Sequence, residues 1–378
     1  MKIKILFCGD LAPTYRNETL LLKDVDLFLD IKENIVESDI AFANLELPLT
    51  NSNKKIEKNG PCLKTSPLVI KQIKKSGLNL LGLANNHLMD YGEIGLKDTL
   101  NCCKNEGIDI VGAGNNILEA QKVYYKRIKG KTIAVIAIAE NEFSIAQANK
   151  GGAAPLDLID NYNQITQAKE NADFVILTLH GGNEYFQYPR PQLRKTCKYF
   201  IDLGVDSVIC HHTHTIGAYE IYKDKFITYG LGNFLFDTNK NKKYWNQGYM
   251  LQLIIDGEKL NYKILPYTQH VDNPGIIKLK GDDKREFFKN MEQVNSVLKN
   301  DELWMQEWYD WCRKNDKSYM VNSYLPIKFR GVGLVTRYIN LSKILTSKGT
   351  IPSKLNMIQC ESHREVLTTI LKNKMDGK

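Results

Sequence analysis

Short apolar runs recur between residues 3 and 210, and helical patterns separate them. Apolar runs of this length, bounded by turn residues, predict buried strands, whereas a period of 3.6 residues predicts amphipathic helices. The predicted strands cover residues 3–8, 40–45, 78–83, 133–139, 174–179 and 208–210, and the predicted helices cover residues 20–36, 67–76, 95–105, 162–171 and 191–203. Strands that alternate with helices in this way predict an α/β layered fold.

The pattern changes beyond this region. Residues 248–255 and 260–266 alternate apolar and polar positions on either side of Asp256-Gly257, which predicts an antiparallel hairpin that extends or closes the sheet. From about residue 283 the period becomes helical, with a last helix over 361–372. We therefore predict a main domain, residues 1–282, followed by a helical C-terminal extension, residues 283–378.

Three tryptophans of this extension, at positions 304, 308 and 311, follow the i, i+4, i+7 spacing of one helix face. Such a stripe is more typical of core packing than of a binding surface.

Composition is that of a globular protein. The chain has 378 residues, of which 43% are hydrophobic and 25% charged. The first residues hold no apolar stretch of signal-peptide length, and no run reaches the roughly 18 apolar residues of a membrane-spanning helix. The eight cysteines form no CxxC pair, which favours reduced thiols. We expect a cytoplasmic protein with no transmembrane segment.

The formal net charge of +8 weakly favours an anionic small-molecule or polymer substrate. A solvated surface with scattered lysines explains the same excess more simply, because no block of five like charges occurs. Since the chain also lacks an RNA- or DNA-binding motif, we expect no nucleic-acid partner.

Polar residues follow most of the predicted strands. In open α/β sheets, ligands bind beyond the carboxyl ends of the strands, so these residues could meet at one site. They are Asp10, Glu46, Asn86, His87, His180, His212 and His214.

The segment His211-His212-Thr213-His214 holds three of only seven histidines in the chain. Imidazoles at alternate positions of a bent strand end can both face one ion, although a hydrogen-bonded loop cluster is the alternative. His180, followed by two glycines that allow close backbone approach, is a plausible third nitrogen donor. Asp10 and Glu46 would supply anionic oxygens, unless Asp10 caps a helix and Glu46 lies on a surface loop.

The segment Asn85-Asn86-His87-Leu-Met-Asp90 combines a possible amide ligand, Asn86, with a possible general acid, His87. Asp90 could orient the imidazole and raise its pKa into a useful range. The alternative for the two asparagines is turn chemistry, because Asn caps helices and tolerates left-handed backbone.

These segments together resemble the CapA family, the poly-γ-glutamate capsule biosynthesis proteins of the calcineurin-like metallophosphatase superfamily. The resemblance covers roughly residues 3–270. It rests on the ordered motifs GD at 9–10, NLELP at 44–48, ANNHLMDYG at 84–92, GAG at 112–114, HGGNEY at 180–185, HHTH at 211–214 and YGLGNFLFD at 229–237.

The resemblance implies a four-layer α/β/β/α sandwich with a dinuclear centre of Mn, Fe or Zn. Glu46 would bridge the ions, Asp10 would be a ligand from the first strand, and His214 would serve one ion. The remaining ligands of the other ion would be Asn86, His180 and His212. His87 would be the general acid, and Asp90 its partner. The same motifs suggest substrate contacts for Asn44, Asn85, Glu184, Tyr185, His211 and Asn233.

The chain departs from the superfamily pattern at two positions. Ala12 stands where a histidine ligand is usual, and His211 stands where the superfamily has glycine. One ion would therefore lack a ligand. Either a single ion binds, or His211 or a water compensates.

Two functional hypotheses follow from the resemblance. The first is a metal-dependent phosphoesterase-like hydrolase acting in capsule or surface-polymer biosynthesis, on poly-γ-glutamate or polysaccharide. The second is a non-catalytic accessory protein among other capsule-synthesis proteins. Specificity would depend on residues 50–63 and 140–155 and on the C-terminal extension.

Overall fold

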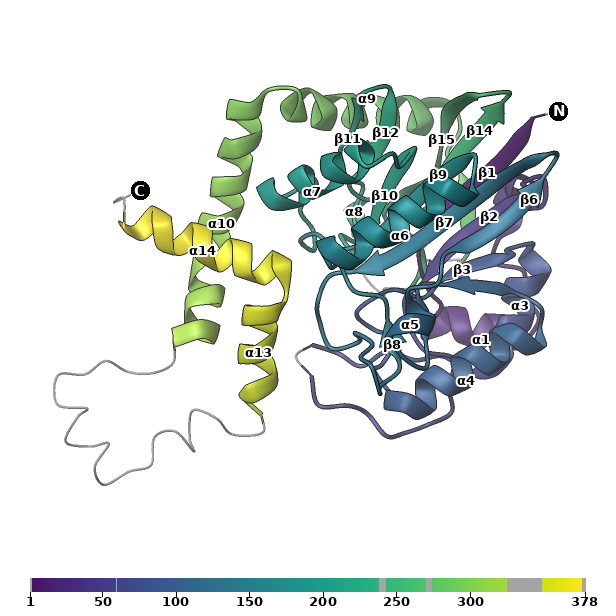
Figure 1. Ribbon diagram of the computed structural model, residues 1–378, viewed down its shortest axis with the longest axis horizontal. Coiled ribbons are helices and arrows are strands. Elements are labelled where there is room, and N and C mark those ends of the chain that lie inside the picture. Colours follow the sequence, from purple (N-terminus) through teal and green to yellow (C-terminus); the bar gives the residue numbers. More distant parts are fainter. Residues whose placement is uncertain (1, 59, 238–242, 270–273, 325–348, 376–378) are drawn as a thin grey trace.

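The computed structural model describes residues 2–58, 60–237, 243–269, 274–324 and 349–375. Its larger strands form two sheets, and helices lie outside them (Figure 1). A short pair, β5 (Ala113–Gly114) and β8 (Gly152–Ala153), lies apart from both sheets.

The first sheet has the order β16-β15-β14-β1-β2-β3-β4, and β13 pairs with the end of β1. The strands β1 to β4 run parallel, whereas β14 is antiparallel to β1. The bounds are β1 (Ile3–Ala12), β2 (Ile40–Leu45), β3 (Leu80–Gly82), β4 (Asp109–Val111), β13 (Asn233–Phe236), β14 (Gln247–Asp256), β15 (Lys259–Gln269) and β16 (Ile276–Lys278). The predicted hairpin is β14 and β15, which pair from Asp256 and Lys259 outward and extend this sheet.

The second sheet has the order β11-β12-β10-β9-β7-β6. Its central strands β7, β9, β10 and β12 are parallel, and its two edge strands are antiparallel to their neighbours. The bounds are β6 (Tyr124–Ile128), β7 (Lys131–Ala139), β9 (Phe174–His180), β10 (Ser207–His211), β11 (Tyr219–Tyr222) and β12 (Lys225–Thr228).

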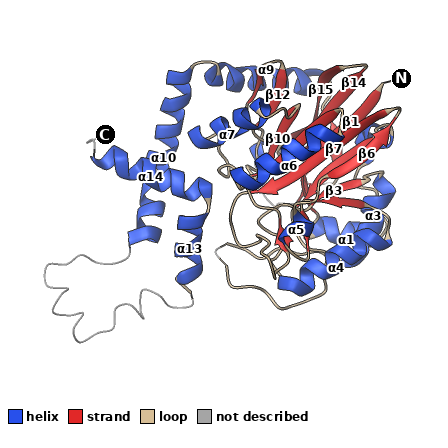
Figure 2. Ribbon diagram, in the orientation of Figure 1, coloured by secondary structure: helices blue, strands red, loops and turns tan. Residues whose placement is uncertain are grey.

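Alternate residues of β7 show how the layers pack. Ile133 and Val135 belong to the core shared with the first sheet, whereas Ala134 and Ile136 belong to a core shared with α6 (Leu158–Asn171) and α7 (Pro191–Asp202). Because successive side chains of a strand face opposite sides, one face of the second sheet meets the first sheet and the other meets helices. Helices α3 (Ile70–Ser76) and α4 (Gly92–Asn105) lie along the first sheet (Figure 2). The predicted four-layer α/β/β/α fold is confirmed.

The helix predicted over residues 20–36 is wrong in extent. Two helices, α1 (Arg16–Leu22) and α2 (Lys32–Val36), are separated by a bend and a short 3₁₀ turn over Leu29–Ile31. Asp24 has φ of 63°, and the Val25 N–H donates to the Leu20 carbonyl over 3.1 Å, which is how a left-handed residue ends a helix. Asp24 therefore ends a helix that the 3.6-residue period alone would continue to residue 36.

Helices dominate the described part of the C-terminal region. They are α9 (Gly281–Leu298), α10 (Asp301–Tyr324), α13 (Ile351–Gln359) and α14 (Glu361–Met375). The last three pack on one another at one end of the sandwich (Figure 1). Trp304 and Trp308 are buried, as the stripe predicted, whereas Trp311 is only partly buried. Residues 325–348 of the predicted extension lie outside the described residues, and the boundary at residue 282 stays a prediction.

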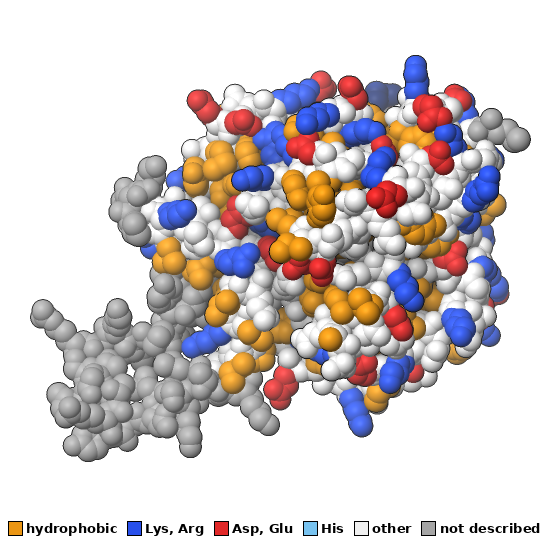
Figure 3. Space-filling model, in the orientation of Figure 1, with side chains coloured by type: hydrophobic (Ala, Val, Ile, Leu, Met, Phe, Trp, Pro, Cys, Tyr) orange, Lys and Arg blue, Asp and Glu red, His pale blue; other side chains and the backbone are white. Residues whose placement is uncertain are grey.

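Among the described residues, no helix combines the length and apolarity needed to span a membrane. All eight cysteines are free thiols. The face shown in Figure 3 mixes basic and acidic side chains and carries no broad patch of a single sign.

Candidate metal centre

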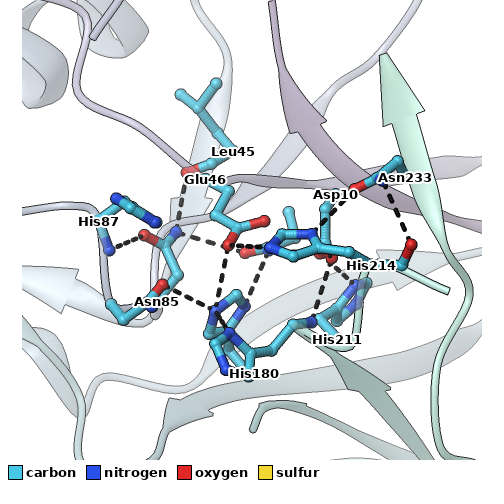
Figure 4. Close-up of polar contacts among 12 residues, drawn as sticks. Asp10, Leu45, Glu46, Asn85, His87, His180, His211, His214 and Asn233 are labelled. Atoms are coloured by element: carbon cyan, nitrogen blue, oxygen red, sulfur yellow. Dashed lines mark hydrogen bonds and ion pairs between the residues drawn. The ribbon is translucent and has the colours of Figure 1, made fainter. Parts of the chain in front are cut away.

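The predicted donors come together where parallel strands of the two sheets end. Asp10 of β1 pairs with Asn44 of β2 on one side and with Asn233 of β13 on the other. In the second sheet, His180 at the end of β9 pairs with His211 at the end of β10. The two sheets therefore present their carboxyl ends to each other, and their polar side chains meet between them (Figure 4).

A glycine lets β13 approach β1 at this point. A Cβ at Gly9 would lie 1.9 Å from the carbonyl oxygen of Gly232, so no other residue fits without moving the backbone. The next amide, of Asp10, donates to the same carbonyl over 3.1 Å. Gly9 thus brings Asn233 beside Asp10.

Glu46 lies at the middle of the cluster. Its side chain is 0% exposed, and neither carboxylate oxygen has a hydrogen-bond partner among the described residues. A buried carboxylate without a partner is strongly unfavourable, so such groups are normally paired or coordinate a metal. Burial and the charges of Asp10 and Glu184 raise the pKa of Glu46 well above its usual range.

One donor group combines Glu46 with His180 and His212, whose ligand atoms lie within 4.8 Å of one another. Nε2 of His180 is 3.1 Å from Nδ1 of His212 and 3.1 Å from Oδ1 of Asn86. Burial lowers the pKa of His212 to about 4, and burial and the charge of His212 lower the pKa of His180. Neutral imidazoles keep the lone pairs with which histidine binds metals.

A second donor group combines Glu46 with Asp10 and His214, again within 4.8 Å. Asn233 donates its amide to the carbonyls of His214 and Trp245, so its Oδ1 is the acceptor that lies 3.0 Å from Nδ1 of His214. This places the ring proton on Nδ1 and leaves the lone pair on Nε2, which lies 3.8 Å from Oε1 of Glu46. A second partner that orients a ligating imidazole is typical of metal sites.

The two groups share Glu46, whose unpartnered oxygens face both. Nitrogen and oxygen donors without cysteine suit divalent Mn, Fe or Zn. His212 and His214 have φ of 92° and 53°, values that non-glycine residues adopt rarely and mostly at functional sites. The residues present therefore fit a divalent metal centre of one or two ions.

His87 lies beside this centre with Asp90 as its partner. Nδ1 of His87 is 2.7 Å from Oδ2 of Asp90, so the predicted orientation is present. The predicted rise in pKa is wrong, because burial and the charge of Lys58 lower the pKa of His87 more than Asp90 raises it. Nζ of Lys58 is 2.5 Å from Asp90 and 3.2 Å from Nδ1 of His87.

Comparison with known families agrees with this arrangement. A model of the bacterial capsule synthesis protein family PGA_cap matches residues 4–238, which include both donor groups. The chain belongs to this family. The resemblance to CapA proteins is thereby confirmed, and the match ends before the C-terminal helices.

Two of the similar curated proteins are named CapA. The capsule biosynthesis protein CapA of Bacillus anthracis is 33% identical over 221 residues, which cover 56% of this chain and 54% of that protein. The PGA biosynthesis protein CapA of Bacillus subtilis is 34% identical over 237 residues, which cover 61% and 62%. A probable polyglutamine synthesis accessory protein of Mycobacterium tuberculosis is 27% identical over 222 residues, covering 55% and 58%. The chain therefore spans little more than half the length of these relatives.

Solved structures that match this chain have lower sequence identity to it than these relatives. A phosphatase from Mycoplasma pneumoniae matches 77% of this chain and 99% of its own, with a TM-score of 0.46 and 13% identity. A putative 5′-nucleotidase from Staphylococcus aureus matches 79% of this chain and 59% of its own, with a TM-score of 0.44 and 14% identity.

In this PGA_cap member, Asn44 and Asn85, two of the predicted substrate contacts, are buried and hydrogen-bonded to residues of the centre or next to it, and their contact with substrate stays a prediction. The amide of Asn44 donates to Asp10 over 2.8 Å and lies 3.1 Å from Nδ1 of His180. Asn85 is 0% exposed; it donates to the Leu45 carbonyl and accepts from the His87 amide. The turn chemistry considered for Asn85 is therefore present.

The two departures from the superfamily pattern lie close to Asp10. Ala12 is buried in the core. Nδ1 of His211 lies 3.2 Å from Oδ1 of Asp10, and neither ring nitrogen has a hydrogen-bond partner among the described residues. Although burial would raise the pKa of Asp10, the approach and charge of His211 and the charges of His180 and His214 lower it. His211 is in neither donor group but is within reach of Asp10.

A cavity of about 330 Å³ adjoins the first donor group. Of the predicted residues, Asn86, His87, Glu184, Tyr185 and His212 line it. The other lining side chains were not predicted individually: Lys58, Pro61, Glu142, Asn183, Trp311, Asn315, Tyr319, Asn356, Cys360, Ser362 and His363. Lys58 and Glu142 lie in the two loops expected to set specificity, and the C-terminal helices supply the last seven.

Proposed function

We propose that this chain is a metal-dependent hydrolase of a phosphate ester or a related anionic bond. The observation that supports it best is the buried carboxylate of Glu46, without a partner of its own, between two histidine-containing donor groups. A structural carboxylate in that position would destabilise the fold, whereas a metal ligand would be satisfied.

One ion would be held by Glu46, His180, His212 and Asn86, and a second by Glu46, Asp10 and His214, with His211 near enough to replace the missing ligand. A divalent ion there supplies Lewis acidity and offsets the negative charge of the bond to be cleaved. Asn44 and Asn233 orient the ligands, and the apolar strands beneath the centre exclude water from its far side.

His87 would be the acid for the leaving oxygen. With the Nδ1 proton donated to Asp90, it would carry a second proton on Nε2 only as the imidazolium, which the negative charge of a bound substrate would favour against the burial that lowers its pKa. Because its Nδ1 faces Asp90, its Nε2 remains as the nitrogen that can meet a substrate in the cavity. Asp90 is itself fixed by the Leu63 amide, over 2.6 Å, and by Lys58. A positioned acid of this kind contributes about 10²- to 10⁴-fold in rate.

Family membership suggests the biological setting. Relatives named for capsule and poly-γ-glutamate biosynthesis support a role in capsule or surface-polymer metabolism, with an anionic polymer or a fragment of one as substrate. We propose that the chain acts in the cytoplasm and contacts other capsule-synthesis proteins.

A non-catalytic accessory role is the alternative. It is favoured by Ala12, which removes one expected ligand, and by a relative named as a synthesis accessory protein. Such a protein would need neither bound metal nor an acid at position 87.

The decisive experiment measures metal content by mass spectrometry and turnover of 4-nitrophenyl phosphodiesters and monoesters with and without Mn²⁺. We would compare wild type, His212→Ala and His87→Ala, with the exposed surface change Glu170→Gln as control. A hydrolase is expected to lose metal in His212→Ala, and to keep metal but lose about 10²-fold or more in kcat in His87→Ala.

If the wild type binds no metal after Mn²⁺ loading, the hydrolase proposal fails. Bound metal with no turnover of any ester would instead favour the accessory role.

A further inference from the structure

Beyond the metal centre, hydrogen-bond acceptors are prominent in the wall of the 330 Å³ cavity. The carboxylates of Glu142 and Glu184 line it, as do the amides of Asn183 and Asn356. These side chains come from three separate places: the loop after β7, the loop after β9, and helix α13. The cavity therefore gathers acceptors that the sequence keeps far apart.

In the described part of the chain, the two carboxylates have no cationic partner and the two amide oxygens have no hydrogen-bond donor. No Lys, Arg or His nitrogen there lies within 4 Å of the carboxylate of Glu142 or Glu184. Asn183 and Asn356 are each 5% exposed, and the Oδ1 atom of each has no hydrogen-bond partner. Two buried amide oxygens left in this state indicate that a donor from a ligand belongs there.

The lysine in the cavity wall is already engaged. Lys58 is paired with Asp90, and its side chain is only 3% exposed. Burial raises the pKa of Glu142 to about 7 although the charge of Lys58 opposes this shift. A second positive charge close to the acceptors would therefore be stabilised.

We propose that this part of the cavity binds a protonated amine of the substrate, set apart from the anionic bond that lies at the metal centre. The inference rests on the proposed hydrolase function and narrows its substrate class to esters that carry a primary ammonium group. An ammonium ion offers three donors and one positive charge, which matches amide and carboxylate oxygens with no cation of their own.

The C-terminal helices are part of this subsite. Asn356 of α13 donates a hydrogen bond to Glu142, so it supplies an acceptor and also holds the carboxylate. The hydroxyl of Ser362, at the start of α14, donates to the Gly182 carbonyl over 2.6 Å, beside Asn183. Arg190 links the main domain to these helices, because it contacts Glu140, which follows β7, at 2.5 Å and Glu365 of α14 at 2.7 Å.

The test compares two esters that differ in one amine: 2-aminoethyl 4-nitrophenyl phosphate and ethyl 4-nitrophenyl phosphate. With Mn²⁺-loaded full-length protein, we expect kcat/KM for the amine to exceed that for the ethyl ester by about tenfold or more, the effect of one charge-assisted hydrogen bond. The ratio should fall toward one in Glu142→Gln. Glu184→Gln should show the same fall, and it provides the measurement if Glu142→Gln does not fold. It should not change in the surface variant Glu170→Gln. A ratio near one in the wild type overturns the proposal.

A binding measurement separates this proposal from the hydrolase function. Calorimetry with phosphoethanolamine and with ethyl phosphate requires no turnover. If neither nitrophenyl ester is cleaved but phosphoethanolamine binds about tenfold more tightly, the amine subsite stands and the hydrolase proposal fails. Equal affinities, or no binding of either compound, overturn the amine subsite.

Discussion

Nε2 of His180 lies 3.5 Å from Oε1 of Glu46, too far for a hydrogen bond and close enough for both to ligate one ion. Neither oxygen of Glu46 has a hydrogen-bond partner among the described residues. The contact is thus unfavourable without a cation and favourable with one.

Substitution of Glu46 by glutamine should therefore have opposite effects with and without metal. In EDTA, the amide removes a buried charge that lies near Asp10, and we expect the free energy of unfolding to rise by about 1–3 kcal/mol. With Mn²⁺, the stabilisation by metal should largely disappear. Thermal unfolding in both conditions measures the two effects, with Glu170→Gln as control. An equal loss of stability in both conditions would show that Glu46 has a structural role instead.

Asn233 is expected to act on the metal through His214. Its Oδ1 holds the Nδ1 proton of that ring, so Asn233→Ala should allow the ring to rotate and weaken metal binding by about 10- to 100-fold. Competition with a chromogenic chelator measures the change in Kd. Asn171→Ala, on the exposed end of α6, is the matched control. Unchanged affinity would mean that packing against Phe236 and Trp245 alone orients the ring.

Much of this centre could be predicted from the sequence because of how parallel strands end. Asp10 and His180 each terminate an apolar run, and the carboxyl ends of parallel strands share one edge of a sheet. Nothing in the local pattern, however, shows that Asn44 and Asn85 support the centre from within. Their roles depend on contacts with Asp10 and Leu45 that only the packed sheets create.

The cavity was less predictable, for a physical reason. A lysine in an irregular loop is normally exposed. The side chain of Lys58 is buried because it donates a hydrogen bond to the carboxylate of Asp90, 32 residues away. His363 reaches the cavity because Arg190 and Glu365, which are 175 residues apart, bring α14 back to the main domain. Contacts at such separations leave no periodic signal in the sequence.

Removal of one member of the Lys58–Asp90 pair should lower the free energy of unfolding more than replacement of both members by apolar residues. Both side chains are nearly inaccessible, at 3% and 0% exposure, so Lys58→Met leaves Asp90 buried with one partner fewer. We expect a loss of about 3 kcal/mol in the free energy of unfolding by urea. The exposed neighbour Lys55→Met should change little. The double variant Lys58→Met/Asp90→Leu should recover part of the loss, and a further additive loss would contradict a coupled buried pair.

His363 should make stability depend on pH through its burial. Burial lowers the pKa of His363 below its ordinary value of 6.5, and the charge of Arg190 acts in the same direction, while Glu140 and Glu184 oppose both. The folded state therefore binds the proton less tightly than the unfolded state. The contribution of neutral His363 is fully present above pH 6.5 and is lost as the pH falls through the folded pKa.

Wild type should accordingly lose stability relative to His363→Gln when the pH is lowered from 8 to 5.5. Urea unfolding of both proteins in EDTA measures this difference, and subtraction removes the other buried histidines, which titrate in both. The glutamine amide can still reach Tyr319, whose hydroxyl lies 2.8 Å from Nδ1 of His363. A difference that stays constant with pH would mean that His363 accepts a proton as readily in the folded protein as in the unfolded chain, and hence that α14 does not seal this side of the cavity from water.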